Sequence, residues 1–370
     1  MKKHISLLAA AFLGAAAILA GCSGQASETE STQAQTETAA QTEASAEASE
    51  AAQDTQAEEN AQPSAEAAGT DQAQGIRIGS LNGPTSMGLA RLMDQSAKGE
   101  ASQAYQFTMA GKADELVGKI ANGDLDIALL PANVASVLYS KTQGGVKVID
   151  INTLGVLYVV ASDDSISSIQ DLAGKTVYMT GKGTTPEFVM NYLLAENGLS
   201  ASDVTMEYKS EAAEVASVLK EDPTAIGVLP QPFATAACIQ NESLKTVLDL
   251  TEQWNILNGD TGSMMVTGVT IVRSEYLAEN GDAVALFLED HQASAAYTQE
   301  NPADAAELVA AQGIVEKAAI AQKALPYCNI VCLTGDEMKK ALEGYLEVLF
   351  NQDAQSVGGN LPGEDFYYIP

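Results

Sequence analysis

The chain has 370 residues, of which 49 are acidic and 19 are basic, so its formal net charge is −30. So negative a chain is poorly suited to neutralise the phosphates of DNA or RNA, and we expect no nucleic-acid partner. Only two histidines occur, His4 and His291, and His4 lies in a segment that we expect to be removed. A multi-histidine metal site is thereby excluded from the mature chain. We predict no catalytic residue, no metal site and no cofactor.

The first residues have the pattern of an export signal. Basic Lys2 and Lys3 precede an uncharged, mostly apolar run over residues 5–19, which is too short to remain as a membrane span. The sequence Leu-Ala-Gly-Cys at residues 19–22 resembles a bacterial lipoprotein lipobox, which implies cleavage before Cys22 and acylation of its thiol. We therefore expect a signal peptide over residues 1–21 and lipid anchoring on the outer face of the bacterial cytoplasmic membrane, at the cell surface or in the periplasm. The alternative is an ordinary secretory signal with a chance cysteine.

Residues 22–74 have the composition of a tether. From residue 23 to residue 74 the chain holds eleven acidic residues, no lysine or arginine and no aromatic residue. Such a segment cannot bury enough apolar surface to offset the entropy lost on ordering. We predict a disordered acidic tether that begins at the lipidated Cys22.

From residue 75 onward, short apolar strands alternate with helices through turns that contain glycine or proline. The predicted strands cover residues 76–81, 105–110, 125–130, 176–180, 204–208, 225–229, 245–250 and 264–272, with two extended segments within 146–161. Helices are predicted after residues 86, 133 and 232, and over residues 112–121, 186–196, 212–219, 282–299, 303–311, 316–325 and 336–350. This alternation favours βαβ units in an α/β fold.

Two polar breaks divide these elements, at residues 162–165 and at residues 258–262. Because the breaks bracket a self-contained α/β unit, we predict that one lobe is inserted into another. Lobe 1 would comprise residues 75–162 plus 263–370, and lobe 2 would comprise residues 163–262. The chain would then cross between the lobes twice.

Four predicted strand-to-helix corners, two in each lobe, share glycine, proline, hydroxyl and amide residues. In open α/β sheets, ligands bind beyond the carboxyl ends of the strands, where the following helices begin. Glycine lets the backbone approach a ligand, proline starts a helix, and hydroxyls and amides exchange hydrogen bonds. The corners supply the candidate ligand-binding residues, which are Asn82, Gly83, Pro84, Thr85, Ser86, Asn133, Lys182, Thr184, Thr185 and Gln231.

Each corner also has a structural alternative. Thr184 and Glu187 match a capping box, and for Glu187 we favour the cap over ligand contact. Thr85 and Ser86 fit helix caps as well as ligand contacts. Gln231 lies between two prolines and is most simply an N-cap.

The remaining reactive side chains favour structural roles. His291 lies in a predicted helix and fits a surface or packing residue better than a catalyst. Cys328 and Cys332 reach each other only if the chain turns between them, so isolated thiols are favoured over a disulfide. The sequence contains no phosphate-binding P-loop, no dinucleotide-binding glycine motif and no serine nucleophile elbow.

With the lipobox and the two-lobed alternation, the chain resembles the substrate-binding lipoproteins of ABC importers, of the nitrate/sulfonate/taurine and thiamine-pyrimidine-precursor type. Four segments carry the resemblance: Gly-Pro-Thr at 83–85, Gly-Asp-Leu-Asp-Ile-Ala at 123–128, Ser-Ile-Gln-Asp-Leu-Ala-Gly-Lys at 168–175 and Gly-Lys-Gly-Thr at 181–184. The resemblance implies a periplasmic-binding-protein type II fold, in which each lobe is a mixed sheet flanked by helices and a cleft lies between the lobes. It also implies delivery of a small-molecule solute to a membrane permease with a cytoplasmic ATPase.

The expected ligand is small, polar and anionic. Helix starts with hydroxyls favour an oxyanion or a carboxylate, and Lys182 is the one cation in the corners. Related amino-acid binders clamp the ligand carboxylate with an arginine, but Arg77, Arg91 and Arg273 all lie outside the corners, which disfavours an α-amino acid. We expect a monomer without enzymatic activity. The alternatives are a lipid-anchored sensory module for a membrane receptor and, less favoured, an enzyme on the same fold.

Overall fold

The computed structural model describes residues 75–370. The expected signal peptide, the expected lipidation site Cys22 and the expected tether lie outside the described residues. Within residues 75–370, no helix combines the length and the apolar character that crossing a membrane would require.

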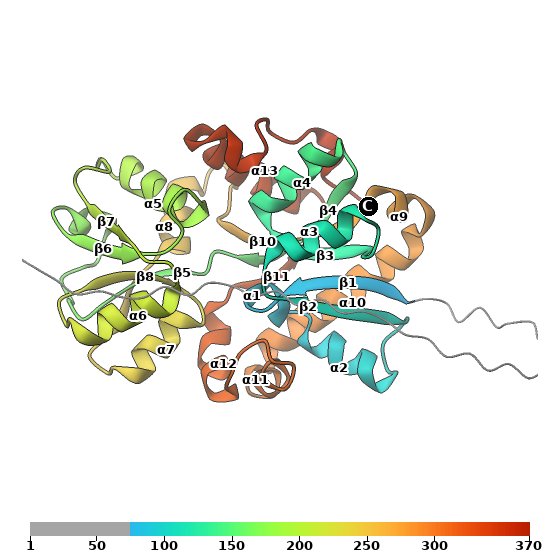
Figure 1. The fold of residues 1–370 in the computed structure, drawn as a ribbon, viewed down its shortest axis with the longest axis horizontal. Helices are drawn as coiled ribbons and strands as arrows, with labels where there is room; N and C mark the ends of the chain where they lie inside the picture. The colour runs from blue at the N-terminus through green and yellow to red at the C-terminus, as the bar shows by residue number, and fades with distance from the viewer. Residues whose placement is uncertain (1–74) are drawn as a thin grey trace, which may run out of the picture. The chain divides into compact units, whose positions relative to one another are not determined.

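Six strands form the first sheet, in the spatial order β11 (Ile330–Leu333), β4 (Val146–Leu154), β10 (Val266–Arg273), β3 (Ile127–Pro131), β1 (Ile76–Leu81), β2 (Tyr105–Ala110) (Figure 1). Strand β1 pairs in parallel with β2 and β3. Strand β10 runs antiparallel to β3 and β4, and β11 runs antiparallel to β4. Strand β10, which comes more than 110 residues after β4 in the sequence, therefore lies between β4 and β3 in the sheet.

Five strands form the second sheet, in the spatial order β7 (Thr205–Tyr208), β6 (Thr176–Met179), β8 (Ile226–Pro230), β5 (Leu157–Ala161), β9 (Lys245–Asp249). Strand β6 pairs in parallel with β7 and β8, whereas β5 runs antiparallel to β8 and β9. Each sheet thus has three neighbouring parallel strands followed by an antiparallel one, which is β10 in the first sheet and β5 in the second. The fold expected from the resemblance, α/β with two mixed sheets flanked by helices, is confirmed.

Thirteen α-helices lie in the part of the chain that the structure describes. Those before β5 or after β10 are α1 (Pro84–Met87), α2 (Ala90–Lys98), α3 (Ala113–Ala121), α4 (Ala132–Thr142), α9 (Ser274–Glu279), α10 (Gly281–Glu300), α11 (Pro302–Ala311), α12 (Ala318–Ala324) and α13 (Gly335–Gln352). Those between β5 and β10 are α5 (Thr185–Glu196), α6 (Ala212–Glu221), α7 (Phe233–Gln240) and α8 (Leu250–Asn258). Helices α8 and α9 and strand β11 were not predicted. Helix α8 begins because the Asp249 carboxylate accepts hydrogen bonds from the backbone N–H groups of Thr251 and Glu252.

Where the chain passes from the first sheet to the second, its backbone packs closely against the segments around Thr251 and Met265. Strand β5 already pairs within the second sheet, so the expected boundary after residue 162 falls later than the point of entry. The entry point is Gly155, where an added Cβ would collide with the side chains of Met265 and Thr251. Glycine is needed here because the outgoing and returning segments run against each other.

An aromatic group ties α8 to helices α5 and α13. The Trp254 side chain of α8 is fully buried, and its ring centroid lies 4.7 Å from that of Tyr192 and 5.4 Å from that of Tyr345. Tyr192 belongs to α5, and Tyr345 belongs to α13. One tryptophan therefore joins a helix that follows the second sheet to the C-terminal helix.

A buried carboxylate holds two strands of the first sheet. Asp126 accepts hydrogen bonds from the Arg77 backbone N–H at 3.0 Å, from Arg77 Nε at 2.9 Å and from Arg273 Nη2 at 3.3 Å. Burial by itself raises the pKa of Asp126, but the hydrogen bonds and charge of Arg77, helped by Arg273, hold the pKa below its usual value. The carboxylate is therefore stabilised in its charged form in the folded protein.

We expect Asp126→Asn to lower the free energy of unfolding at neutral pH by about 1.5–3 kcal/mol, because hydrogen bonds to a charged acceptor are lost. Since the folded-state pKa is lowered, this stabilisation is fully present above the unfolded-state pKa of about 3.9 and is lost as the pH falls through the folded-state value. Urea denaturation between about pH 7 and pH 3 measures it, and the wild-type and variant curves should converge in acid. The control is Asp124→Asn at an exposed site, and a constant gap between the Asp126→Asn and wild-type curves at every pH would contradict the expectation.

Candidate functional site

A cavity of about 750 Å³ lies between corners of the two sheets. On one side it is lined by Asn82, Gly83 and Pro84, which directly follow β1. On the other side it is lined by residues 230–233, at the end of β8 and the start of α7. Val156, between the two sheets, and Thr267 of β10 also face this space. The cavity therefore meets both sheets and a segment that connects them.

One face of α6 forms a wall of the cavity. Its lining residues are spaced three and four apart along the helix, and they are Ala213, Ala216, Ser217 and Lys220. The opposite face of α6 buries Val215 and Leu219 beside Gly227 of β8. Packing on the sheet thus turns a face of small residues toward the cavity, with Lys220 as its cation.

Residues around the start of α12 form the facing wall. Ile314, Val315 and Ile320 contribute aliphatic side chains, and Glu316 is the one carboxylate among the described lining residues. Phe233 adds an aromatic ring that is 42% exposed. Most of the lining is therefore apolar, and its polar groups are few and separate. Ligand pockets commonly have this composition, because a few polar groups suffice to orient a solute.

The structure brings four of the ten predicted site residues to this cavity, namely Asn82, Gly83, Pro84 and Gln231. Thr85 and Ser86 lie behind them and are buried. The Ser86 hydroxyl donates to the backbone oxygen of Leu81 and lies 2.5 Å from Ser80 Oγ. Ser86 thus stabilises the corner and has no open face toward a solute.

The other four predicted residues do not line the cavity, and they are Asn133, Lys182, Thr184 and Thr185. Helix α13 packs against both α4 and α5, so the C-terminal part of the chain partly covers Asn133 and Thr185, whereas Lys182 and Thr184 are exposed (Figure 1). Asn133 Nδ2 donates to the backbone oxygen of Ser356 at 3.4 Å, and Thr185 lies beside Tyr345 of α13. Lys182 Nζ lies 5.6 Å from the centre of the Tyr208 ring.

The predicted capping box does not form at α5. Thr184 Oγ1 donates to the backbone oxygen of Gly181 at 2.7 Å and makes no bond to the helix. Glu187 accepts hydrogen bonds from the Gly183 backbone N–H and, at 2.8 Å, from the Tyr208 hydroxyl. Burial and the Glu187 carboxylate raise the pKa of Tyr208, so its hydroxyl keeps the proton that it donates. Glu187 therefore has a structural role, as favoured, but with different partners.

Gln231 is not the N-cap of α7, which is Pro232, but its side chain supports the start of that helix. Its Oε1 accepts hydrogen bonds from the Thr235 hydroxyl at 2.8 Å and from the Thr235 backbone N–H at 3.3 Å, which stabilises the first turn of α7. The same residue lines the cavity. The hydrogen bonds to Thr235 thus hold the Gln231 side chain in place at the cavity wall.

The three arginines are engaged elsewhere. Arg77 and Arg273 bind Asp126, and the Arg91 guanidinium lies 4.9 Å from the centre of the Tyr297 ring. Among the described residues, the lining therefore includes no arginine that could grip a carboxylate with two parallel hydrogen bonds.

Sequence reasoning missed the α6 face and the α12 wall. The spacing of residues 213, 216, 217 and 220 was a readable signal for one helix face. Nothing in that spacing says whether the face meets the sheet, solvent or a cavity. The residues near α12 lie about 230 positions after β1, and only tertiary packing brings them to the same space.

Comparison with known proteins identifies related sequences and folds. Residues 119–305 match the family model described as NMT1/THI5 like. No curated protein matches the chain.

Three solved structures illustrate the likeness in fold. A Parabacteroides distasonis structure described as an ABC transporter is 22% identical, with a TM-score of 0.67 over 80% of this chain and 98% of that chain. The periplasmic aliphatic sulphonate binding protein SsuA of Escherichia coli is 15% identical, with a TM-score of 0.62 over 80% of this chain and 92% of that chain. The alkanesulfonate-binding protein SsuA of Xanthomonas axonopodis pv. citri, bound to MOPS, is 16% identical, with a TM-score of 0.53 over 78% of this chain and 94% of that chain. At these identities the likeness establishes the fold.

Proposed function

Because this chain belongs to the NMT1/THI5-like family, we propose that it is an extracytoplasmic solute-binding protein of an ABC importer. The observation that carries the proposal is the cavity of about 750 Å³ between the corner after β1 and the corner after β8. A volume of this size suits a small molecule. The protein would capture its solute there and deliver it to a membrane permease with a cytoplasmic ATPase.

To capture a solute, the protein needs only noncovalent contacts between the solute and both sides of the cavity. The unit built on the first sheet would act as one lobe and the unit built on the second sheet as the other, with the first crossing near Gly155. A solute that touches Asn82 on one side and Gln231 on the other binds the closed arrangement more tightly than the open one. Only such a difference in affinity can shift the equilibrium toward closure. No bond is formed or broken, so the protein would act as a binding protein without catalysis.

The ligand that suits this lining is small and anionic, with an apolar part. Lys220, Ser217 and the start of α7 would attract the anionic group, because a helix N-terminus carries partial positive charge. The aliphatic wall around Ile314 and Ile320 would hold the apolar part. Two of the related structures are described as binding aliphatic sulfonates or alkanesulfonates, which is compatible with this chemistry.

The same proposal includes a lipid anchor. Cleavage before Cys22 and acylation of its thiol would leave the folded part on an acidic tether at the outer face of the cytoplasmic membrane. Mass spectrometry of the mature N-terminal peptide tests this, because acylation adds the mass of the fatty chains to Cys22. An unmodified N-terminus at another residue would contradict the anchor and leave the solute-binding proposal standing.

Calorimetry of the full chain tests solute binding. The panel is nitrate, sulfonates, bicarbonate, carboxylates and thiamine precursors, each titrated separately. We expect one class to bind at one molecule per chain with a Kd of roughly 1 μM or below, and X-ray scattering to report a more compact protein in its presence. Tight binding of peptides alone, or unchanged scattering across the whole panel, would overturn the proposal.

Two lysines distinguish this cavity from the predicted corner at residues 181–185. We expect Lys220→Gln to weaken binding of the anionic solute by about tenfold, since Lys220 lines the cavity. Lys182→Gln is the matched control and should leave the Kd unchanged, because Lys182 lies over the Tyr208 ring. Calorimetry with the tightest solute of the panel measures both values. The reverse result would place the anion at the 181–185 corner.

A further inference from the structure

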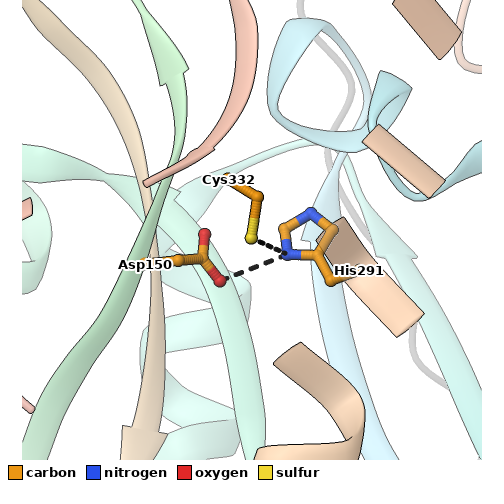
Figure 2. A group of neighbouring side chains, drawn as sticks. All are labelled: Asp150, His291 and Cys332. Atoms are coloured by element: carbon orange, nitrogen blue, oxygen red, sulfur yellow. Dashed lines mark hydrogen bonds and ion pairs between the residues drawn. The ribbon is translucent and has the colours of Figure 1, made fainter. Parts of the chain in front are cut away.

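Three side chains from distant parts of the chain meet inside the unit built on the first sheet. Asp150 belongs to β4, His291 to α10 and Cys332 to β11. His291 Nδ1 lies 3.2 Å from Asp150 Oδ2 and 4.0 Å from Cys332 Sγ, and one ligand atom of each residue lies within 4.8 Å of the others. Figure 2 shows the carboxylate and the sulfur both facing the same ring nitrogen. The three residues thus form a compact N/O/S donor set.

Both strand residues lie at irregularities of the sheet. The pairing of β4 with β10 shifts register between Thr270 and Ile271, directly after the pair Thr270–Asp150. The pairing of β11 with β4 shifts between Ile330 and Leu333, and Cys332 lies within this interval. Such bulges change the direction of side chains and are frequent next to functional sites. Two independent shifts accompany the meeting of Asp150 and Cys332 at His291.

We propose that Asp150, His291 and Cys332 bind one Zn²⁺ ion. Zinc takes nitrogen and oxygen ligands at about 2.0–2.2 Å and sulfur at about 2.3 Å, so neighbouring ligand atoms around a tetrahedral ion lie about 3.3–3.7 Å apart. The observed separations of 3.2 and 4.0 Å bracket this range. A thiolate and a carboxylate together carry two negative charges, which balance the ion. The mixed N/O/S set favours Zn²⁺ over Mg²⁺ or Ca²⁺, which prefer oxygen ligands.

The surrounding hydrogen bonds orient the donors. Thr270 Oγ1 donates to Asp150 Oδ1 at 2.8 Å, and Asn152 Nδ2 donates to Thr270 Oγ1 at 3.2 Å. These two linked hydrogen bonds hold the Asp150 carboxylate by its Oδ1 atom and leave Oδ2 directed at His291. Hydrogen-bonded carboxylate ligands of this kind are typical of metal sites. His291 Nε2 is buried without a polar partner among the described residues, so Nδ1 is the nitrogen that faces the other donors.

An ion could reach this site from the edge of the sheet, and once bound it would hold neighbouring elements together. Asp150 and His291 are fully buried, whereas Cys332 is partly exposed on the edge strand β11. Zn²⁺ would enter past Cys332 and release two protons to solvent, one from the Cys332 thiol and one from His291 Nδ1, where it makes the hydrogen bond to Asp150; the imidazole would keep its proton on Nε2. The bound ion would hold β11 and α10 against β4. Cys328 is also buried, but its Sγ lies 3.2 Å from the backbone oxygen of Ala324, and it is not part of the cluster.

Metal titration of the untagged full chain tests the proposal. After removal of metal with a chelator, we expect one equivalent of Zn²⁺ to bind and to raise the unfolding temperature. Replacement by Co²⁺ should produce the absorption band of a thiolate bound to cobalt. Cys332→Ser, at a partly exposed position, should lose this band and weaken Zn²⁺ binding at least about tenfold. Thr270→Val, which removes a supporting hydrogen bond, should weaken Zn²⁺ binding about 10–100-fold and keep the band.

The matched controls are Cys328→Ser and Cys238→Ser, each removing a thiol outside the cluster, and Cys22→Ser for the thiol outside the described residues. All three should bind one Zn²⁺ with the cobalt band of the wild type. Circular dichroism confirms that each variant is folded. Failure of the folded wild type to bind stoichiometric Zn²⁺, or wild-type binding by Cys332→Ser, would overturn the proposal. Neither result depends on which solute occupies the cavity.

Discussion

Ala216→Trp should reduce solute binding at least about 100-fold while the protein remains folded. Ala216 is partly buried in the α6 wall, and an indole at this position would extend into the cavity. The space that it takes is needed by the solute, so the loss comes from steric exclusion and not from a missing contact. Ala216 also packs against the core beside Val215 and Leu219, so Ala213→Trp, at an exposed lining position on the far face of α6, is the second variant and should leave the packing of α6 on β8 intact. Calorimetry with the tightest solute of the panel measures the loss, and circular dichroism checks the fold.

The control for this variant makes the same substitution elsewhere. Ala303→Trp changes an exposed residue of α11 that does not line the cavity, and it should bind the solute with the wild-type Kd. Wild-type binding by Ala216→Trp would show that the solute lies outside this cavity. In that case the corners at residues 131–133 and 181–185 would become the alternative location.

Trp254→Ala should destabilise the protein by about 3–5 kcal/mol, which is the usual range for removing a large buried aromatic side chain. Trp254 is fully buried between Tyr192 and Tyr345, so its loss leaves a cavity and removes two aromatic contacts. The indole N–H has no hydrogen-bond partner among the described residues, so the loss is one of packing. Chemical denaturation at neutral pH measures the change in the free energy of unfolding.

Ile256→Ala is the control on the same helix. Ile256 is 70% exposed on α8, and its truncation should change the free energy of unfolding by no more than about 0.5 kcal/mol. Equal effects of the two substitutions would mean that the contact between α8, α5 and α13 contributes little. A large effect of Trp254→Ala alone would show that this contact stabilises the folded protein.

The family and the fold class were accessible from the sequence. The glycine and proline turns separate short apolar runs so clearly that the predicted strands at residues 76–81 and 105–110 have the same bounds as β1 and β2. The resemblance to this family of binding proteins is confirmed by the match to the NMT1/THI5-like model, and the expected fold by the two mixed sheets. Elements with weaker local signals were missed. Strand β11 has only four residues, and α8 is recognisable mainly by its capping Asp249.

Histidine and cysteine illustrate the limit of local reasoning. His291 was assigned to the surface or to packing on the basis of its helix alone, and it is fully buried beside Asp150. Cys328 and Cys332 are free thiols, as favoured, but Cys332 lies close to His291. Residues 150, 291 and 332 have no sequence spacing that links them. The order of strands in the sheet creates this cluster.

The sequence by itself determined the alternation of strands and helices, because apolar periodicity and turn residues act over a few positions. It also pointed to the corners after β1 and β8, whose residues line the cavity. Only the tertiary structure decided which corners line the cavity: α13, which begins 150 residues after α5 begins, packs beside Thr185, whereas residues 182–184 are exposed away from the cavity. It likewise decided that one face of α6 and the residues near α12 complete the cavity. Contacts between distant segments depend on how whole elements pack, and no local pattern encodes that packing.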